Sequence, residues 1–158
     1  MQLKRRNQTL FIVIHCSYTP STMDIGVEEI DRWHRDRGWH SCGYHYVIRR
    51  DGTIEHGRPR DTIGAHVRGF NEMSLGICLI GGMSKGRTPK DEDNFTFQQG
   101  VALHELLQQI RQKYTQAQVV GHNELDSSRT CPVVNLDLIK RYNNEIAEHD
   151  VTRSGHDD

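Results

Sequence analysis

Residues 9–16, Thr-Leu-Phe-Ile-Val-Ile-His-Cys, decide the fold class of this chain. The first six are β-branched, aliphatic or aromatic without interruption, which predicts a central strand buried on both faces, as in parallel sheets. Residues 74–80, Ser-Leu-Gly-Ile-Cys-Leu-Ile, predict a second buried strand.

In the rest of the chain, the local sequence patterns alternate between those typical of helices and those typical of strands. Apolar residues at helical spacing before Gly38, and a capping-box pair formed by Thr96 and Gln99, predict two helices. Asp51-Gly52 predicts a hairpin turn. The further elements expected are a helix over 27–37, strands over 44–50 and 53–56, a helix from 97 to about 114, a strand over 117–121, and a helix over about 136–147 that begins after Asn135. This order predicts a single α/β domain with a mixed central β-sheet flanked by helices.

Domain organisation and composition narrow the class of protein. The chain has 158 residues, enough for one domain, which we place at residues 9–147, between a polar N-terminal arm (1–8) and a polar tail (148–158). Its net charge of −1 argues against a dedicated nucleic-acid-binding protein. The sequence has no apolar run long enough for a membrane span and no signal-peptide pattern, so we expect a cytoplasmic protein.

Histidine and cysteine are the residues that point to chemistry. The chain has 10 His and 4 Cys, and no Cys-x-x-Cys pair. Two predicted strands run directly into His15 and His122, at the edge where α/β sheets bind ligands, and Cys131 follows nine residues later. Two imidazoles and a thiolate form a suitable zinc site with one open position. By residue logic alone the alternative stays open, with His15 a buried strand-end residue and Cys131 an inert apolar filler.

The motifs of the chain occur in the order of one known family. They are residues 11–17 (Phe-Ile-Val-Ile-His-Cys-Ser), 28–39 (Glu-Glu-Ile-Asp-Arg-Trp-His-Arg-Asp-Arg-Gly-Trp), 43–53, 64–71 (Gly-Ala-His-Val-Arg-Gly-Phe-Asn), 74–82 and 121–132. Over residues 9 to about 145 the chain resembles the zinc-dependent N-acetylmuramoyl-L-alanine amidases of phages. The wider family of these enzymes includes the peptidoglycan recognition proteins. The resemblance implies that residues 9–147 are an amidase catalytic domain.

The resemblance also implies roles for individual residues. The ligands of one zinc ion fall on His15, His122 and Cys131, and the catalytic tyrosine falls on Tyr44. Phage members place a lysine two residues before the cysteine ligand, where this chain has Arg129. An arginine can supply a fixed positive charge, but it cannot realistically pass a proton to a leaving group.

Other polar residues receive a binding or a structural interpretation. We expect His66 to line the substrate groove, and Arg68 and Asn71 to contact the stem peptide or sugar. His45 alternates with Tyr44 and is expected to be structural. Cys16 should point away from the site into the core, and Cys78 should be a packing residue.

The implied function is that of a phage endolysin, a zinc amidase that cuts stem peptides from the glycan strands of peptidoglycan. It would accumulate in the host cytoplasm and act on periplasmic peptidoglycan after another protein breaches the inner membrane. The family suggests a monomer. One alternative is a module that binds peptidoglycan without cutting it, although such modules typically lack the cysteine ligand. A second is an added role as inhibitor of a phage RNA polymerase, known for one family member whose N-terminus is longer and different.

Overall fold

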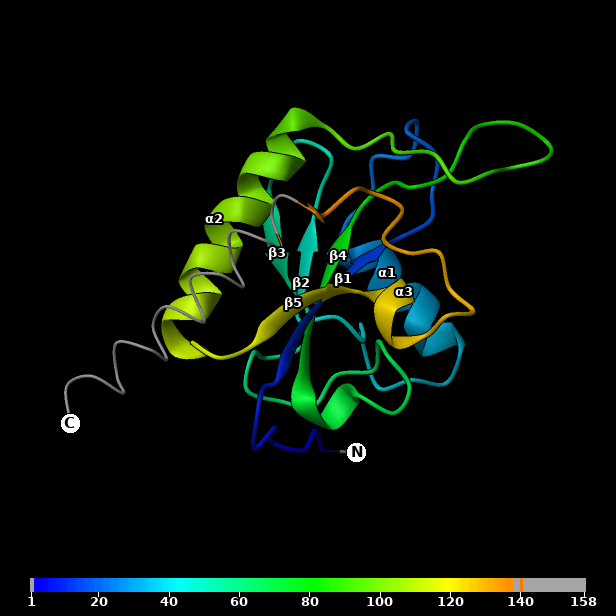
Figure 1. The fold of residues 1–158 in the computed structure, drawn as a ribbon. Helices are drawn as coiled ribbons and strands as arrows, with labels where there is room; N and C mark the ends of the chain where they lie inside the picture. Colours follow the sequence, from blue (N-terminus) through cyan, green and yellow to red (C-terminus); the bar gives the residue numbers. More distant parts are fainter. Residues whose placement is uncertain (1, 138–139, 141–158) are drawn as a thin grey trace.

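A mixed five-stranded sheet forms the centre of the computed structural model, which describes residues 2–137 and Lys140 (Figure 1). The strands lie in the order β3-β2-β4-β1-β5, and only the β2–β3 pair is antiparallel. Their bounds are Phe11–Cys16 for β1, Tyr46–Ile48 for β2, Ile54–His56 for β3, Ser74–Leu79 for β4 and Gln118–Gly121 for β5. The predicted α/β class with a mixed central sheet is confirmed.

The two faces of the sheet are covered by different helices. Helix α2 (Phe97–Lys113) covers one face (Figure 1), where Ile12 and Ile14 of β1 pack with Leu103 and Leu107 of the helix. Helix α1 (Val27–Asp36) belongs to the opposite face, where a smaller apolar cluster gathers. Because side chains alternate along a strand, His15 lies on the α1 side of the sheet while Ile14 faces α2. This alternation places the polar site and the larger core on opposite faces.

The predicted helix ends agree closely with the structure. Helix α1 is followed by Gly38 with φ +88°, a left-handed conformation that glycine adopts without steric cost. At the start of α2, Thr96 Oγ1 accepts a hydrogen bond from Gln99 N at 3.1 Å, and Gln99 Oε1 accepts one from Thr96 N at 2.9 Å. Both signals were readable from sequence because they depend on neighbours in the chain.

The strand and helix ends next to the site differ from expectation. Strand β1 continues through Cys16, so His15 lies inside the strand rather than after it. Strand β2 is only three residues long, and Tyr44 precedes it. A short helix that was not predicted, α3 (His122–Leu125), begins at His122. Asn135 Oδ1 accepts a hydrogen bond from Asp137 N at 2.9 Å, as an N-cap does, but most of the helix expected over 136–147 lies outside the described residues.

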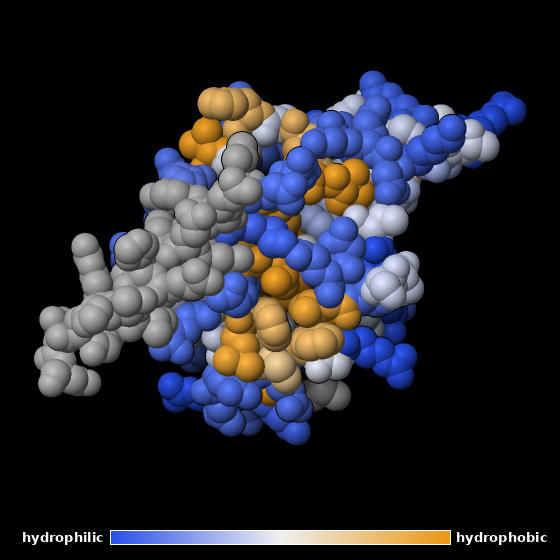
Figure 2. Space-filling model, in the orientation of Figure 1, coloured by the Kyte–Doolittle hydropathy of each residue, from blue (hydrophilic) through white to orange (hydrophobic). Residues whose placement is uncertain are grey.

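The segments outside the sheet are polar and partly anchored. The N-terminal arm pairs with the loop before β4, since Arg5 forms a β-bridge with Thr62 and the Arg6 side chain is buried. The segment between β4 and α2, at residues 83–94, projects from the body in Figure 1 and is largely hydrophilic in Figure 2. No helix of the described part is long and apolar enough to cross a membrane.

Candidate active site

Two histidines meet where β1 and β5 end side by side. His15 is the fifth residue of β1, and His122 follows β5 as the first residue of α3. The parallel pairing of these strands brings residues 107 positions apart in sequence to within 3.1 Å, measured between the two Nδ1 atoms. Burial lowers the pKa of both imidazoles, and the nearby His66 and His122 lower that of His15 further, which favours the neutral forms. Neutral imidazoles carry the free lone pair that a metal requires.

A third histidine lies behind His15. His66 is 8% exposed, and its Nδ1 lies 2.8 Å from His15 Nε2. The backbone around it is held by Asn71, whose side-chain oxygen accepts hydrogen bonds from the amides of His66 and Val67 at 2.9 Å each. The structure therefore places His66 beside the histidine pair, and gives the Asn71 oxygen a role within the loop.

Tyr44 lies against His15 of this pair. Its ring centroid is 5.0 Å from that of His15. Burial, and the nearby Cys78 thiol, raise the pKa of the Tyr44 phenol well above its ordinary value, so the hydroxyl remains protonated and can donate a hydrogen bond. His45 accepts a hydrogen bond from Gly76 N at its Nδ1 and reaches the Thr62 carbonyl with Nε2, which agrees with a structural role.

Cys131 is anchored next to His122 through the backbone. Its carbonyl accepts a hydrogen bond from Asn123 N at 2.8 Å. Its thiol, however, contacts Cys16, with the two Sγ atoms 2.9 Å apart. The Cys16 thiol lowers the pKa of Cys131 by hydrogen bonding to it, which favours the thiolate. Cys16 is buried as expected, but the expectation that it points away from the site is wrong, because its thiol contacts Cys131, one of the expected ligands.

The structure thus unites two of the three expected metal ligands directly. Within the described residues, no group of three His, Cys, Asp or Glu side chains converges in the geometry of a metal site. His15 and His122 face each other, and the thiol of Cys131 is turned to Cys16.

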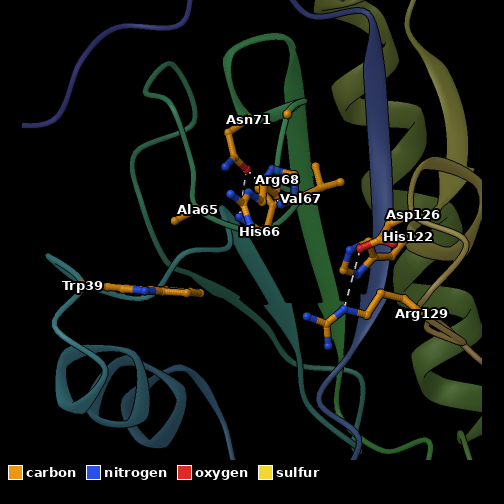
Figure 3. Close-up of a pocket in the computed structure, with 10 residues that line it drawn as sticks. Trp39, Ala65, His66, Val67, Arg68, Asn71, His122, Asp126 and Arg129 are labelled. Atoms are coloured by element: carbon orange, nitrogen blue, oxygen red, sulfur yellow. Dashed lines mark hydrogen bonds and ion pairs between the residues drawn. The ribbon is translucent and has the colours of Figure 1, made fainter.

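A cavity of about 410 Å³ opens beside the histidines (Figure 3). His66, Arg68 and Asn71, the three residues expected to bind substrate, all line it. His122 and Arg129 line the wall facing them, and Trp39 stands apart at the edge of the view. The cavity is open to a ligand, and His122 of the histidine pair lines its wall.

Five lining residues were not singled out from the sequence, and two of them, Trp39 and Asp126, carry polar groups. Trp39 is 38% exposed and follows Gly38, the glycine after helix α1. Its only signal in the sequence was its place in the motif of residues 28–39. Asp126 lies 3.8 Å from Arg129, measured from carboxylate oxygen to Nε, and its own oxygen also accepts hydrogen bonds from Ser128. Their place in the site depends on turns that bring them to the cavity.

Comparison with known proteins agrees with this arrangement. Residues 5–134 match the model of a family described as N-acetylmuramoyl-L-alanine amidase. The chain belongs to this amidase family. It is 44% identical to an endolysin of Klebsiella phage KP32 over 136 residues, which cover 86% of this chain and 88% of that protein. Its identity to an endolysin of Escherichia phage T7 is 41% over 137 residues, with the same coverage.

Solved structures show the same fold. The amidase superposes on the Ph2119 endolysin of a Thermus scotoductus bacteriophage with a TM-score of 0.71 at 31% identity, covering 90% of this chain and 89% of that one. The amidase LysC from Clostridium intestinale gives a TM-score of 0.70 at 30% identity, with 84% and 81% covered. The chain is therefore a phage-type N-acetylmuramoyl-L-alanine amidase, which hydrolyses a carbon–nitrogen amide bond.

Proposed function

We propose that this amidase is a zinc-dependent endolysin that cuts the amide between N-acetylmuramic acid and L-Ala of peptidoglycan. The observation that carries the zinc assignment is the facing pair of Nδ1 atoms of His15 and His122, 3.1 Å apart at the edge of a cavity. Two nitrogens bound to one tetrahedral zinc at 2.0–2.1 Å lie about 3.3 Å apart, so the observed separation fits a shared metal.

The third ligand in this proposal is Cys131. The cysteine sits beside His122 through its backbone hydrogen bond to Asn123, and its lowered pKa favours the thiolate that binds zinc. Two neutral imidazoles and one thiolate form a catalytic rather than a structural set, because a fourth position stays open. One ion held in this way would lower the pKa of a water molecule and polarise the amide carbonyl.

Tyr44 and Arg129 then act on the charge that develops at the amide. The Tyr44 phenol, protonated and beside His15, donates a hydrogen bond to the oxygen of the tetrahedral intermediate. Arg129 is 64% exposed at the cavity wall, where its guanidinium supplies a permanent positive charge. Because a guanidinium does not release its proton, Arg129 acts in this proposal by charge alone.

In this proposal the substrate binds in the cavity, between its two walls. Arg68 and Arg129 both line it, and their charges suit the carboxylates of a stem peptide. His66 and Asn71 shape the wall between them. We place the working protein as a monomer that accumulates in the host cytoplasm and reaches periplasmic peptidoglycan once the inner membrane is breached.

Mass spectrometry of material released from purified Gram-negative sacculi tests the proposal. We expect free stem peptides with an L-Ala amino terminus, their loss after a zinc chelator, and their return when zinc is added back. Binding to sacculi with no release would contradict the amidase assignment. Release that persists in the metal-free protein would contradict the zinc assignment alone.

A further inference from the structure

A chain of hydrogen bonds runs from His15 through His66 and Ser74 to the protein backbone. His15 Nε2 lies 2.8 Å from His66 Nδ1, and His66 Nε2 lies 3.3 Å from Ser74 Oγ. Ser74 Oγ in turn donates to the Phe70 carbonyl at 2.7 Å. Ser74 and His15 are at most 1% exposed, so water does not compete for these groups.

The backbone end of this chain fixes the direction of every hydrogen bond in it. A carbonyl oxygen only accepts, so the Ser74 hydroxyl must donate its one proton to Phe70. The hydroxyl oxygen can then only accept from His66 Nε2, which places the His66 proton there. A neutral imidazole with Nε2 protonated has an unprotonated Nδ1, and this atom must accept from His15 Nε2. His15 is left with a free lone pair on Nδ1, the atom that faces His122.

We propose that His66 and Ser74 are positioning residues that hold His15 in the tautomer required to bind the metal through Nδ1. The inference rests on the zinc site proposed above and deepens it. Histidine ligands commonly donate their second ring N–H to a partner that sets the tautomer and ring orientation. Here the partner is a second histidine whose own tautomer is set by a serine.

The packing around His66 shows that the ring is held for this contact. A Cβ atom at Gly76 would lie 2.6 Å from His66 Cγ, so the ring lies directly over the backbone of β4. Asn71 holds the His66 amide from the other side. The backbone of β4 thus bounds the His66 ring on one side, and Asn71 fixes the backbone that carries it, which is the support a positioning residue requires.

Zinc affinity, measured with zinc ion by competition with a chromogenic chelator, tests this role separately from activity. We expect His66→Leu to weaken zinc binding by about 10- to 100-fold, the usual cost of losing such a partner. His66→Asn keeps an acceptor near the position of Nδ1 and should restore most of the affinity. Ser74→Ala removes the group that sets the tautomer of His66 and should give a smaller loss.

His45→Leu is the matched control. His45 is 1% exposed and its ring centroid is 5.7 Å from that of His66, but its nitrogens contact Gly76, Thr62 and Arg6 rather than His15. Its replacement should lower the melting temperature and leave zinc affinity unchanged. Long-range ¹H–¹⁵N correlation spectra of the wild-type imidazoles provide a direct readout, in which His15 and His66 should both carry their proton on Nε2.

The outcomes separate this inference from the proposed function. Wild-type protein that binds no zinc would overturn the zinc site and the inference with it. Wild-type protein that binds zinc, with equal affinity in His66→Leu, would overturn only the positioning role. A His15 proton found on Nδ1 in the metal-free protein would also overturn it, whatever the stability of the variants.

Discussion

Arg129 occupies the position for which the family resemblance implies a lysine, and the two side chains differ in what they can do. Both carry positive charge, but only an amine can give up a proton near neutral pH. The exposed guanidinium pairs with Asp126 at 3.8 Å and lines the cavity. The residue is therefore suited to hold charge at a developing oxyanion and unsuited to proton transfer.

We expect Arg129→Ala to lower kcat by about 10²- to 10³-fold, as loss of an oxyanion donor does, while bound zinc remains unchanged. Arg129→Lys should keep most of the activity. Steady-state kinetics with soluble muropeptides, together with metal analysis, provide the measurement. Arg68→Ala is the control, because loss of a wall residue on the other side should raise KM more than it lowers kcat. An unchanged kcat in Arg129→Ala would remove this residue from catalysis.

The Tyr44 hydroxyl gives a second prediction at this scale. Tyr44→Phe removes one hydrogen-bond donor next to His15 and keeps the ring that packs there, so kcat should fall by about 10²-fold with little change in stability. Tyr46→Phe is the matched control, since Tyr46 packs in the core on the α2 face. Equal activities of the two variants in the same assay would refute the role of Tyr44.

Helix α2 is tied to the sheet by one buried side chain at its first turn. Gln99 is fully buried, and its Nε2 donates to the Ile48 carbonyl at 3.2 Å and to the Ile80 carbonyl at 2.9 Å. The same carboxamide closes the capping box with Thr96. One residue thus caps the helix and sets its position on β2 and on the residue that follows β4.

Replacement of these residues should separate the two effects. Thr96→Ala loses the cap and should cost about 1 kcal/mol of unfolding free energy. Gln99→Leu leaves the Thr96 amide without this partner and deprives two carbonyls of a donor, so it should cost about 3 kcal/mol. Urea unfolding provides the measurement, with exposed Gln98→Ala as the neutral control. A smaller cost for Gln99→Leu than for Thr96→Ala would contradict the anchoring role.

Stability of the whole molecule should depend on pH through its buried histidines. Burial lowers the pKa of His45 to about 4. The positive charges of Arg6 and Arg58 lower this pKa further, while the hydrogen bond to the Thr62 backbone raises it in part. Between about pH 6.5 and pH 4 the unfolded chain therefore binds a proton that the native protein does not bind. Stability is full above this range and falls as the pH drops through it.

We expect His45 alone to account for a loss of about 3 kcal/mol in unfolding free energy from neutral pH to about pH 4. Urea unfolding at several pH values, with a chelator present to exclude metal linkage, measures this slope. His45→Leu should be less stable at neutral pH and show a shallower slope. An identical slope in this variant would assign the acid sensitivity to other groups, such as His34, whose pKa burial also lowers to about 4.

The order of elements and the candidate ligands were predictable because their signals are local. The apolar run before His15, the Asp51-Gly52 turn and the Thr96–Gln99 cap each depend on residues close in the chain. The motif order also pointed to the amidase family, which the comparisons confirm. Strand ends were less predictable, since β1 continues past Ile14 through its pairing with β4.

The fold class, the family and the residue types available for chemistry all follow from the order of amino acids. Which of these residues meet depends on how the elements pack. Parallel pairing of β1 with β5 brings His15 to His122, and the loop held by Asn71 places His66 behind them. The contact of Cys16 with Cys131 likewise joins residues 115 positions apart. Such contacts depend on strand register and on the path of loops, both of which are set by packing over the whole core. The spacing of residues along the chain therefore does not predict them.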